Sequence, residues 1–196
     1  MASSKSPLYT ALAFFFALIV LAGGAAKFYR GVSTMAKSGS DPKVRELLEK
    51  SDKAAEEANR HSDVVAPMFQ ELLIEFDRLG LAAFRSEKRE ACQKVIDHYK
   101  AIGGHLQEAS KLMVEATQLG TEAKLTEFLL ARSKSYGLLI QAAQKNQEIV
   151  SAAMDESLAD TDAVLNKIEA LAVSRDADHK AANEAAAEAD AILKKS

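Results

Sequence analysis

The chain has 196 residues, of which 48% are hydrophobic and 27% charged, a composition typical of folded proteins that excludes wholesale disorder. Its net charge of −3 is unevenly distributed. Residues 1–40 carry four basic side chains and no acidic one, whereas residues 41–196 carry 21 basic and 28 acidic side chains. Nucleic-acid binding requires clustered Lys and Arg, so this acidic, mixed surface predicts no nucleic-acid partner.

An uncharged run of 19 residues, LYTALAFFFALIVLAGGAA, follows a short N-terminal tail (residues 1–7) and occupies residues 8–26. As a helix it would rise about 28 Å, close to the roughly 30 Å thickness of a bilayer's hydrocarbon core. Lys5 precedes the run, and Lys27 and Arg30 follow it. The pattern favours a single-pass transmembrane anchor that contacts membrane lipid. The alternative is a cleaved signal peptide, because Gly24 and Ala26 offer the small residues that such cleavage needs.

Residues 27–40 are mostly small and polar and follow no helical period, so they are expected to form a flexible linker. The basic residues beside the apolar run slightly outnumber those before it, which favours a cytoplasmic body, whereas a short N-terminal tail more commonly stays inside. We expect an extracytoplasmic body.

Long helices are indicated for the rest of the chain. It has three prolines and nine glycines, and residues 68–196 contain no proline at all. Apolar residues recur at steps of three and four from Val44 onward, which is the spacing of one face of a helix and not the alternation of a strand. The sequence therefore predicts an all-α fold, with an antiparallel helical bundle over residues 41–173.

Three reversals are expected within this bundle. Asp41-Pro42 has the residue types that begin a helix, and Gly80 and Gly120 suit the left-handed conformation that ends one. Near residues 155–162 the apolar stripe changes phase, which indicates a third turn with Asp160 and Thr161 as caps. Four helices are expected; the alternative is three helices with a much longer third one.

Finer expectations concern the breaks and caps. Pro67 should kink the first helix or divide it near residues 61–63. After the reversal at Gly80, the apolar pattern of the second helix resumes with Leu81. Gly103-Gly104 should bend or briefly break the second helix, and Thr121 should cap the third. Residues 174–196 are rich in alanine with a thin apolar stripe, so they are expected to form a polar helical tail that frays or packs shallowly.

Few residues have the types and spacing that chemistry requires. The single cysteine, Cys92, excludes an intrachain disulfide, a cysteine-based zinc site and a Cys-x-x-Cys pair. His61, His98, His105 and His179 form none of the familiar metal-binding spacings, although two turns of helix place His98 and His105 on one side. No phosphate loop or nucleophile elbow occurs. We therefore expect no catalytic residue, no metal, no cofactor and no enzymatic activity.

Three polar residues of the expected third helix stand out. Arg132 and Asn146 fall on the same heptad position as apolar residues, and Tyr136 lies one turn after Arg132. A polar side chain in a helical seam can fix the register between helices, and it can also line a small-ligand pocket between them. Both interpretations of Arg132, Tyr136 and Asn146 stay open.

Together these features predict a membrane-anchored helical bundle that acts as a scaffold, tether or assembly subunit. It would work through coiled-coil-like protein–protein contacts, with a partner or with itself. The alternative is an extracytoplasmic domain that senses a small ligand bound between helices.

Overall fold

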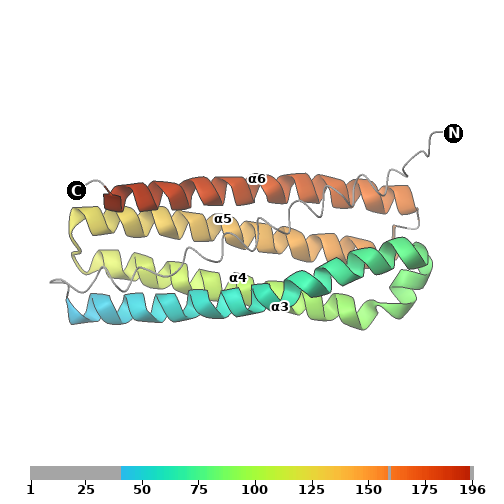
Figure 1. The fold of residues 1–196 in the computed structure, drawn as a ribbon, viewed down its shortest axis with the longest axis horizontal. Coiled ribbons are helices and arrows are strands. Elements are labelled where there is room, and N and C mark those ends of the chain that lie inside the picture. The colour runs from blue at the N-terminus through green and yellow to red at the C-terminus, as the bar shows by residue number, and fades with distance from the viewer. Residues whose placement is uncertain (1–40, 159, 195–196) are drawn as a thin grey trace.

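The computed structural model describes residues 41–158 and 160–194, and the elements it contains there are all helices (Figure 1). They are α3 (Pro42–Glu87), α4 (Arg89–Gln118), α5 (Ala123–Met154) and α6 (Thr161–Lys194). The all-α fold and the choice of four helices over three are therefore confirmed. The expected anchor (residues 8–26) and linker lie outside the described residues, and none of the four helices is long and apolar enough to cross a membrane.

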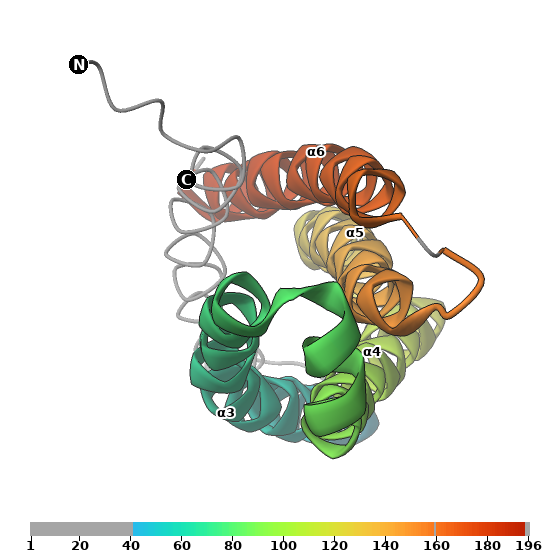
Figure 2. The ribbon, with the colours of Figure 1, turned by 90° about the vertical axis from the view of Figure 1, so that its right-hand side faces the viewer.

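The four helices run up and down beside one another, and each packs on the next along the chain (Figures 1 and 2). The helix pairs with substantial contacts are α3 with α4, α4 with α5, and α5 with α6. Helices α3 and α6 make no comparable contact, so the described helices form a curved, open array and not a closed ring (Figure 2).

Apolar stripes meet at each of these helix pairs. On the α3–α4 side, the rings of Phe69 and Tyr99 meet edge to face, with centroids 6.1 Å apart. Met113 of α4 and Phe128 and Leu129 of α5 are essentially inaccessible to solvent. Each large side chain buried in this way contributes about 1.5–3 kcal/mol, so these stripes hold the array together.

Helix α3 begins as the sequence predicts and continues further than predicted. The Asp41 carboxylate accepts a hydrogen bond from the amide of Lys43 at 2.8 Å, and Pro42 occupies the first turn. Pro67 lies inside α3 without dividing it, so the predicted division near residues 61–63 is wrong; Figure 1 shows α3 changing direction along its length. Val65 and Phe69 are buried on either side of Pro67, and this packing keeps the helix continuous.

The break in α3 lies at Gly80, whose φ of 73° and ψ of 165° are not helical. The chain then forms two further turns that end at Glu87, and α4 begins at Arg89, so the connection between the two helices extends beyond the reversal expected at Gly80. These two extra turns of α3 place the Arg85 side chain beside the C-terminal end of α5. Its guanidinium donates to the carbonyls of Ala153, Asp155 and Leu158 at 2.9, 2.6 and 2.9 Å, which ties the end of α3 to the last turn of α5 and to the loop that follows it.

Replacing Gly80 with alanine is expected to destabilise the protein by about 1–3 kcal/mol, because a side chain strains this backbone conformation although nothing lies within 4 Å of the added carbon. Gly104→Ala is the matched control. Gly104 is helical and equally open, so alanine there should stabilise by about 0.5–1 kcal/mol. Urea unfolding followed by circular dichroism measures both; the same sign for the two changes would contradict this account.

The remaining turns follow the sequence in part. Helix α4 stays helical through Gly103-Gly104, so a break there is wrong. Gly120 adopts the predicted left-handed conformation, with φ of 79°. Thr121 does not cap α5: its hydroxyl pairs with that of Thr126, and the residue before α5 is Glu122.

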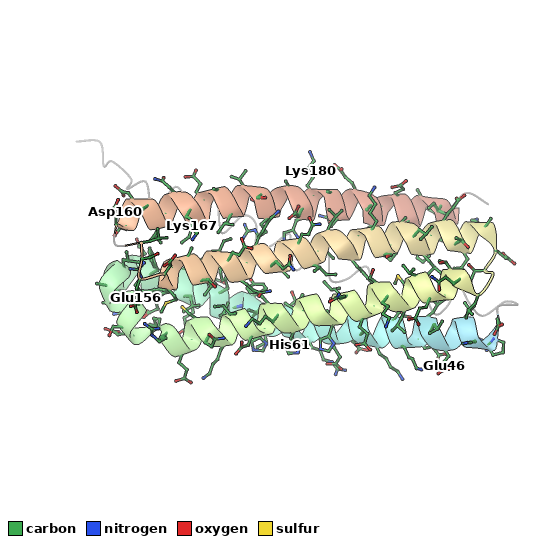
Figure 3. The ribbon with its side chains drawn as sticks, turned by 180° about the vertical axis from the view of Figure 1, so that it is seen from behind. Glu46, His61, Glu156, Asp160, Lys167 and Lys180 are labelled. Atoms are coloured by element: carbon green, nitrogen blue, oxygen red, sulfur yellow. The ribbon has the colours of Figure 1, made fainter. Side chains whose placement is uncertain are left out.

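The third turn separates α5 from α6, as predicted. The Asp160 carboxylate accepts from the amide of Asp162 at 3.3 Å, so Asp160 is the predicted cap that forms, and Thr161 is the first residue of α6. Figure 3 places Glu156 and Asp160 at the same end of the array. Residues 174–194 do not form a separate tail, because α6 continues through them to Lys194 with Ala182 and Ala189 buried. Alanine suffices there because the small side chains allow a neighbouring helix to approach closely.

Candidate functional site

A row of polar side chains runs along the interface between α5 and α6, and we call it the polar layer: Arg132, Ser135 and Asn146 of α5 with Arg175, Asp176 and Asp190 of α6. The first of its contacts joins Arg132 to Asp190, with 2.7 Å between Nη2 and Oδ1. The Arg132 side chain is 5% exposed and that of Asp190 is 36% exposed. The guanidinium also lies over the Phe128 ring, 5.6 Å from its centroid, which adds a cation–π attraction.

The second contact of the polar layer centres on Arg175, which is 5% exposed. Its Nη1 donates to Oδ1 of Asn146 at 3.2 Å, and its Nε and Nη2 donate to Oδ1 of Asp176 at 2.9 and 2.8 Å. A buried charge is tolerated only when it is paired and hydrogen-bonded, and Asn146 and Asp176 supply this pairing. Asn146 therefore has its partner on the neighbouring helix, as a residue that fixes register would.

Two further residues complete this interface. The Ser135 hydroxyl donates to the carbonyl of Ala182 at 2.9 Å. Tyr136, the third predicted site residue, is fully buried in the hydrophobic core. The structure thus brings Arg132, Tyr136 and Asn146 onto the inward side of α5, where Arg132 and Asn146 each pair with a side chain of α6.

Beside the polar layer, Lys145 of α5 forms an ion pair with Asp178 of α6. His179 follows Asp178, and burial, reinforced by the positive charge of Arg175, lowers the pKa of His179 below its usual value of 6.5. Its imidazole is therefore neutral at pH 7.

The α3–α4 interface contains a cluster that the sequence did not predict, and we call it the histidine cluster: His61, His98 and His105. The Nδ1 atoms of His61 on α3 and His98 on α4 lie 2.9 Å apart. The ring of His105 stacks on that of His61, with centroids 5.6 Å apart and an angle of 23°. Sequence spacing indicated only that His98 and His105 share a side of α4; the contact with His61 depends on how α3 packs on α4.

Cys92 and the histidines are the residues that nucleophilic or metal chemistry would use. Burial raises the pKa of the Cys92 thiol to about 11, so it stays protonated and packs as a small apolar group. Within residues 41–158 and 160–194, no three or more His, Cys, Asp or Glu side chains converge on a position that could hold a metal ion. The histidine cluster is therefore a set of imidazoles that contact one another.

An open pocket of about 570 Å³ lies between α4 and α5, and no residue of the polar layer or of the histidine cluster lines it. Its walls are mainly polar and include one basic and one acidic side chain. They are formed by Gln93, Ile96, Lys100, Gln144, Gln147, Glu148 and Ser151. None of Arg132, Tyr136 and Asn146 lines this pocket. The predicted ligand residues therefore belong to the helix interface and not to this pocket.

These observations define an antiparallel array of four long helices joined by apolar stripes and one buried polar layer. Comparison with protein-family models, curated proteins and solved structures finds no match to this chain.

Proposed function

We propose that this protein is a membrane-anchored helical scaffold that holds a protein partner, or a second copy of itself, through the flanks of its helices. The observation that carries the proposal is the open array: α3 and α6 each pack on one described helix and not on each other. A helix in a bundle has neighbours on two sides. The side of α3 that faces away from α4 and the side of α6 that faces away from α5 therefore suit contact with further helices.

The array also has the rigidity that a scaffold needs. Its helices are 30 to 46 residues long, and α6 with 34 residues extends about 50 Å at the usual rise of 1.5 Å per residue. The buried Arg132–Asp190 and Arg175–Asn146 contacts hold α5 and α6 in one register. A tether or assembly subunit requires such a fixed spacing between the surfaces it presents.

The proposed attachment rests on residues 8–26, whose 19 uncharged residues match the thickness of a bilayer. Alkaline extraction of membranes, combined with the intact mass of the purified chain, tests it. We expect the full-length chain in the membrane fraction. A mature chain that has lost residues 1–26 would instead support the signal-peptide alternative. Protease accessibility in intact and in opened cells tests the proposed extracytoplasmic side.

Association is tested by crosslinking the full-length chain in its native membrane. Ile74 of α3 and Val173 of α6 are exposed apolar residues on the two outer helices, and Leu130 is an exposed apolar residue on α5. Ile74→Glu and Val173→Glu together are expected to remove a crosslinked complex that Leu130→Glu leaves intact. A chain that is monomeric and uncrosslinked, or an equal loss in Leu130→Glu, would refute the proposed contact through the outer helices.

One observation favours ligand sensing as a second candidate function. Nε of Arg132 is buried and has no hydrogen-bond acceptor among the described residues. A small anionic molecule entering beside Phe128 and Asp190 would supply one. A ligand that binds the folded state raises its melting temperature by mass action, so a screen of small anionic metabolites should show a shift that Arg132→Met abolishes. A screen without any shift eliminates this candidate.

A further inference from the structure

The histidine cluster lies where the two helices α3 and α4 meet, and Figure 3 places His61 midway along this pair. His61, His98 and His105 are all partly exposed, so protons reach them from solvent. Histidine is the side chain whose ordinary pKa, about 6.5, lies nearest to physiological pH. The charge of three imidazoles in contact can therefore change near that pH.

The 2.9 Å separation of the two Nδ1 atoms determines which protonation states fit. A hydrogen bond between them requires one Nδ1 to carry a proton and the other to accept it. When both rings are protonated, each Nδ1 carries a hydrogen. The hydrogen bond is then lost, and two positive charges face each other across the helix interface.

Among the residues that the structure describes, the charges around His61 do little to offset this repulsion. From α4, the titratable groups that act on His61 are His98 and His105, and on its own helix the group is Glu57. The Glu57 carboxylate is already paired with Arg60, with 2.6 Å between its oxygen and Nη1. The other helix that α3 meets, α5, makes only marginal contact with it.

We propose that His61, His98 and His105 form a proton-sensitive contact that holds α3 on α4 at neutral pH and loosens this helix pair on acidification. The device acts at the α3–α4 interface, so acidification would shift α3, and with it the outer side of α3, relative to the rest of the array; any effect on a bound partner rests on the proposed scaffold function. The proton-sensitive contact itself stands on the histidine geometry.

The direction of the pH dependence follows from His61. Burial, together with His98 and His105, lowers the pKa of His61 below its usual value of 6.5. The unfolded or separated chain then binds protons more readily than the folded one, so stability rises with pH. The stabilisation is present in full above pH 6.5 and is lost as the pH falls below that value toward the folded-state pKa.

Cys92 provides a built-in reporter of this opening. It is the only cysteine, it is 1% exposed, and it lies one heptad before Tyr99, whose ring meets Phe69 of α3. Separation of α3 from α4 should expose the thiol to a disulfide reagent such as 4,4′-dithiodipyridine. Dividing the rate for the urea-unfolded chain by that for the folded chain at each pH gives a protection factor free of the reagent's own pH dependence.

The experiment measures Cys92 protection in the full-length chain, in detergent, at about pH 7.5 and about pH 5.5, on either side of the ordinary histidine pKa. We expect a several-fold loss of protection on acidification in the wild-type chain. His61→Gln and His98→Gln, which keep a polar side chain without the titration, should each reduce this loss. The matched control is His179→Gln, which removes a titrating histidine from α6 and should leave the loss unchanged.

The outcomes separate a local device from general acid unfolding. Unchanged protection in the wild-type chain would overturn the proposal, and so would a loss that His61→Gln and His98→Gln both retain. A loss abolished equally by His179→Gln would also overturn it, because the acid response would then arise at α6. Far-UV circular dichroism at the higher pH establishes that each variant is folded before its acid response is compared.

Discussion

Phe128→Ala is expected to destabilise the protein by about 3–5 kcal/mol, the range for removing a fully buried aromatic side chain. Phe128 is 1% exposed and belongs to the hydrophobic core, and its ring also faces the Arg132 guanidinium. Alanine leaves a cavity between α5 and its neighbours and removes this attraction. In a chain of this length, each 1 kcal/mol lowers the melting temperature by about 2–4 °C, so the effect is readily measured.

Two controls accompany this prediction. Leu130 lies two residues further along α5 and is 50% exposed, so Leu130→Ala should change stability by less than about 1 kcal/mol. Phe128→Leu keeps most of the side-chain volume but loses the aromatic ring. Its loss of stability should therefore lie between those of Phe128→Ala and Leu130→Ala. Equal costs for Phe128→Ala and Leu130→Ala would show that α5 does not bury this face.

The number of helices could be predicted because the signals for it are local. Apolar residues at steps of three and four, a left-handed glycine at Gly120, and the Asp160 cap each act within one or two turns of the chain. Local chemistry at Pro67 predicts either a kink or a division of the helix, and the division does not occur because packing of α3 on α4 overrides the lost hydrogen bond. Local rules fail where tertiary contacts decide.

The contacts between helices were predicted less completely. Asn146 could be singled out because a polar residue interrupts an apolar heptad position. Its partner Arg175 could not, because the alanine-rich segment after residue 173 has too thin an apolar stripe to reveal its buried face. The His61–His98 contact depends on the register of α3 on α4, which the turns between Gly80 and Lys88 set, and spacing along the chain does not encode that register.

The Arg132–Asp190 pair shows how burial decides which partner of an ion pair is costly to lose. Arg132 is 5% exposed, whereas Asp190 is 36% exposed and can be hydrated from one side. Removing the carboxylate leaves an uncompensated charge in the interior, whereas removing the guanidinium leaves an acid that water can solvate. The two truncations of one contact should therefore have very different costs.

Asp190→Ala is accordingly expected to destabilise the protein by about 3 kcal/mol, and Arg132→Met by less than about 1 kcal/mol, because methionine fills the same space without a charge. Urea unfolding of both variants, with the double variant closing the cycle, measures the difference. The double variant should be nearly as stable as Arg132→Met alone, since the aspartate matters only while the buried arginine is present. Equal costs for the two single variants would mean that water reaches the Arg132 guanidinium, and the polar layer would then be a hydrated channel between α5 and α6, with room for the small ligand of the second candidate function.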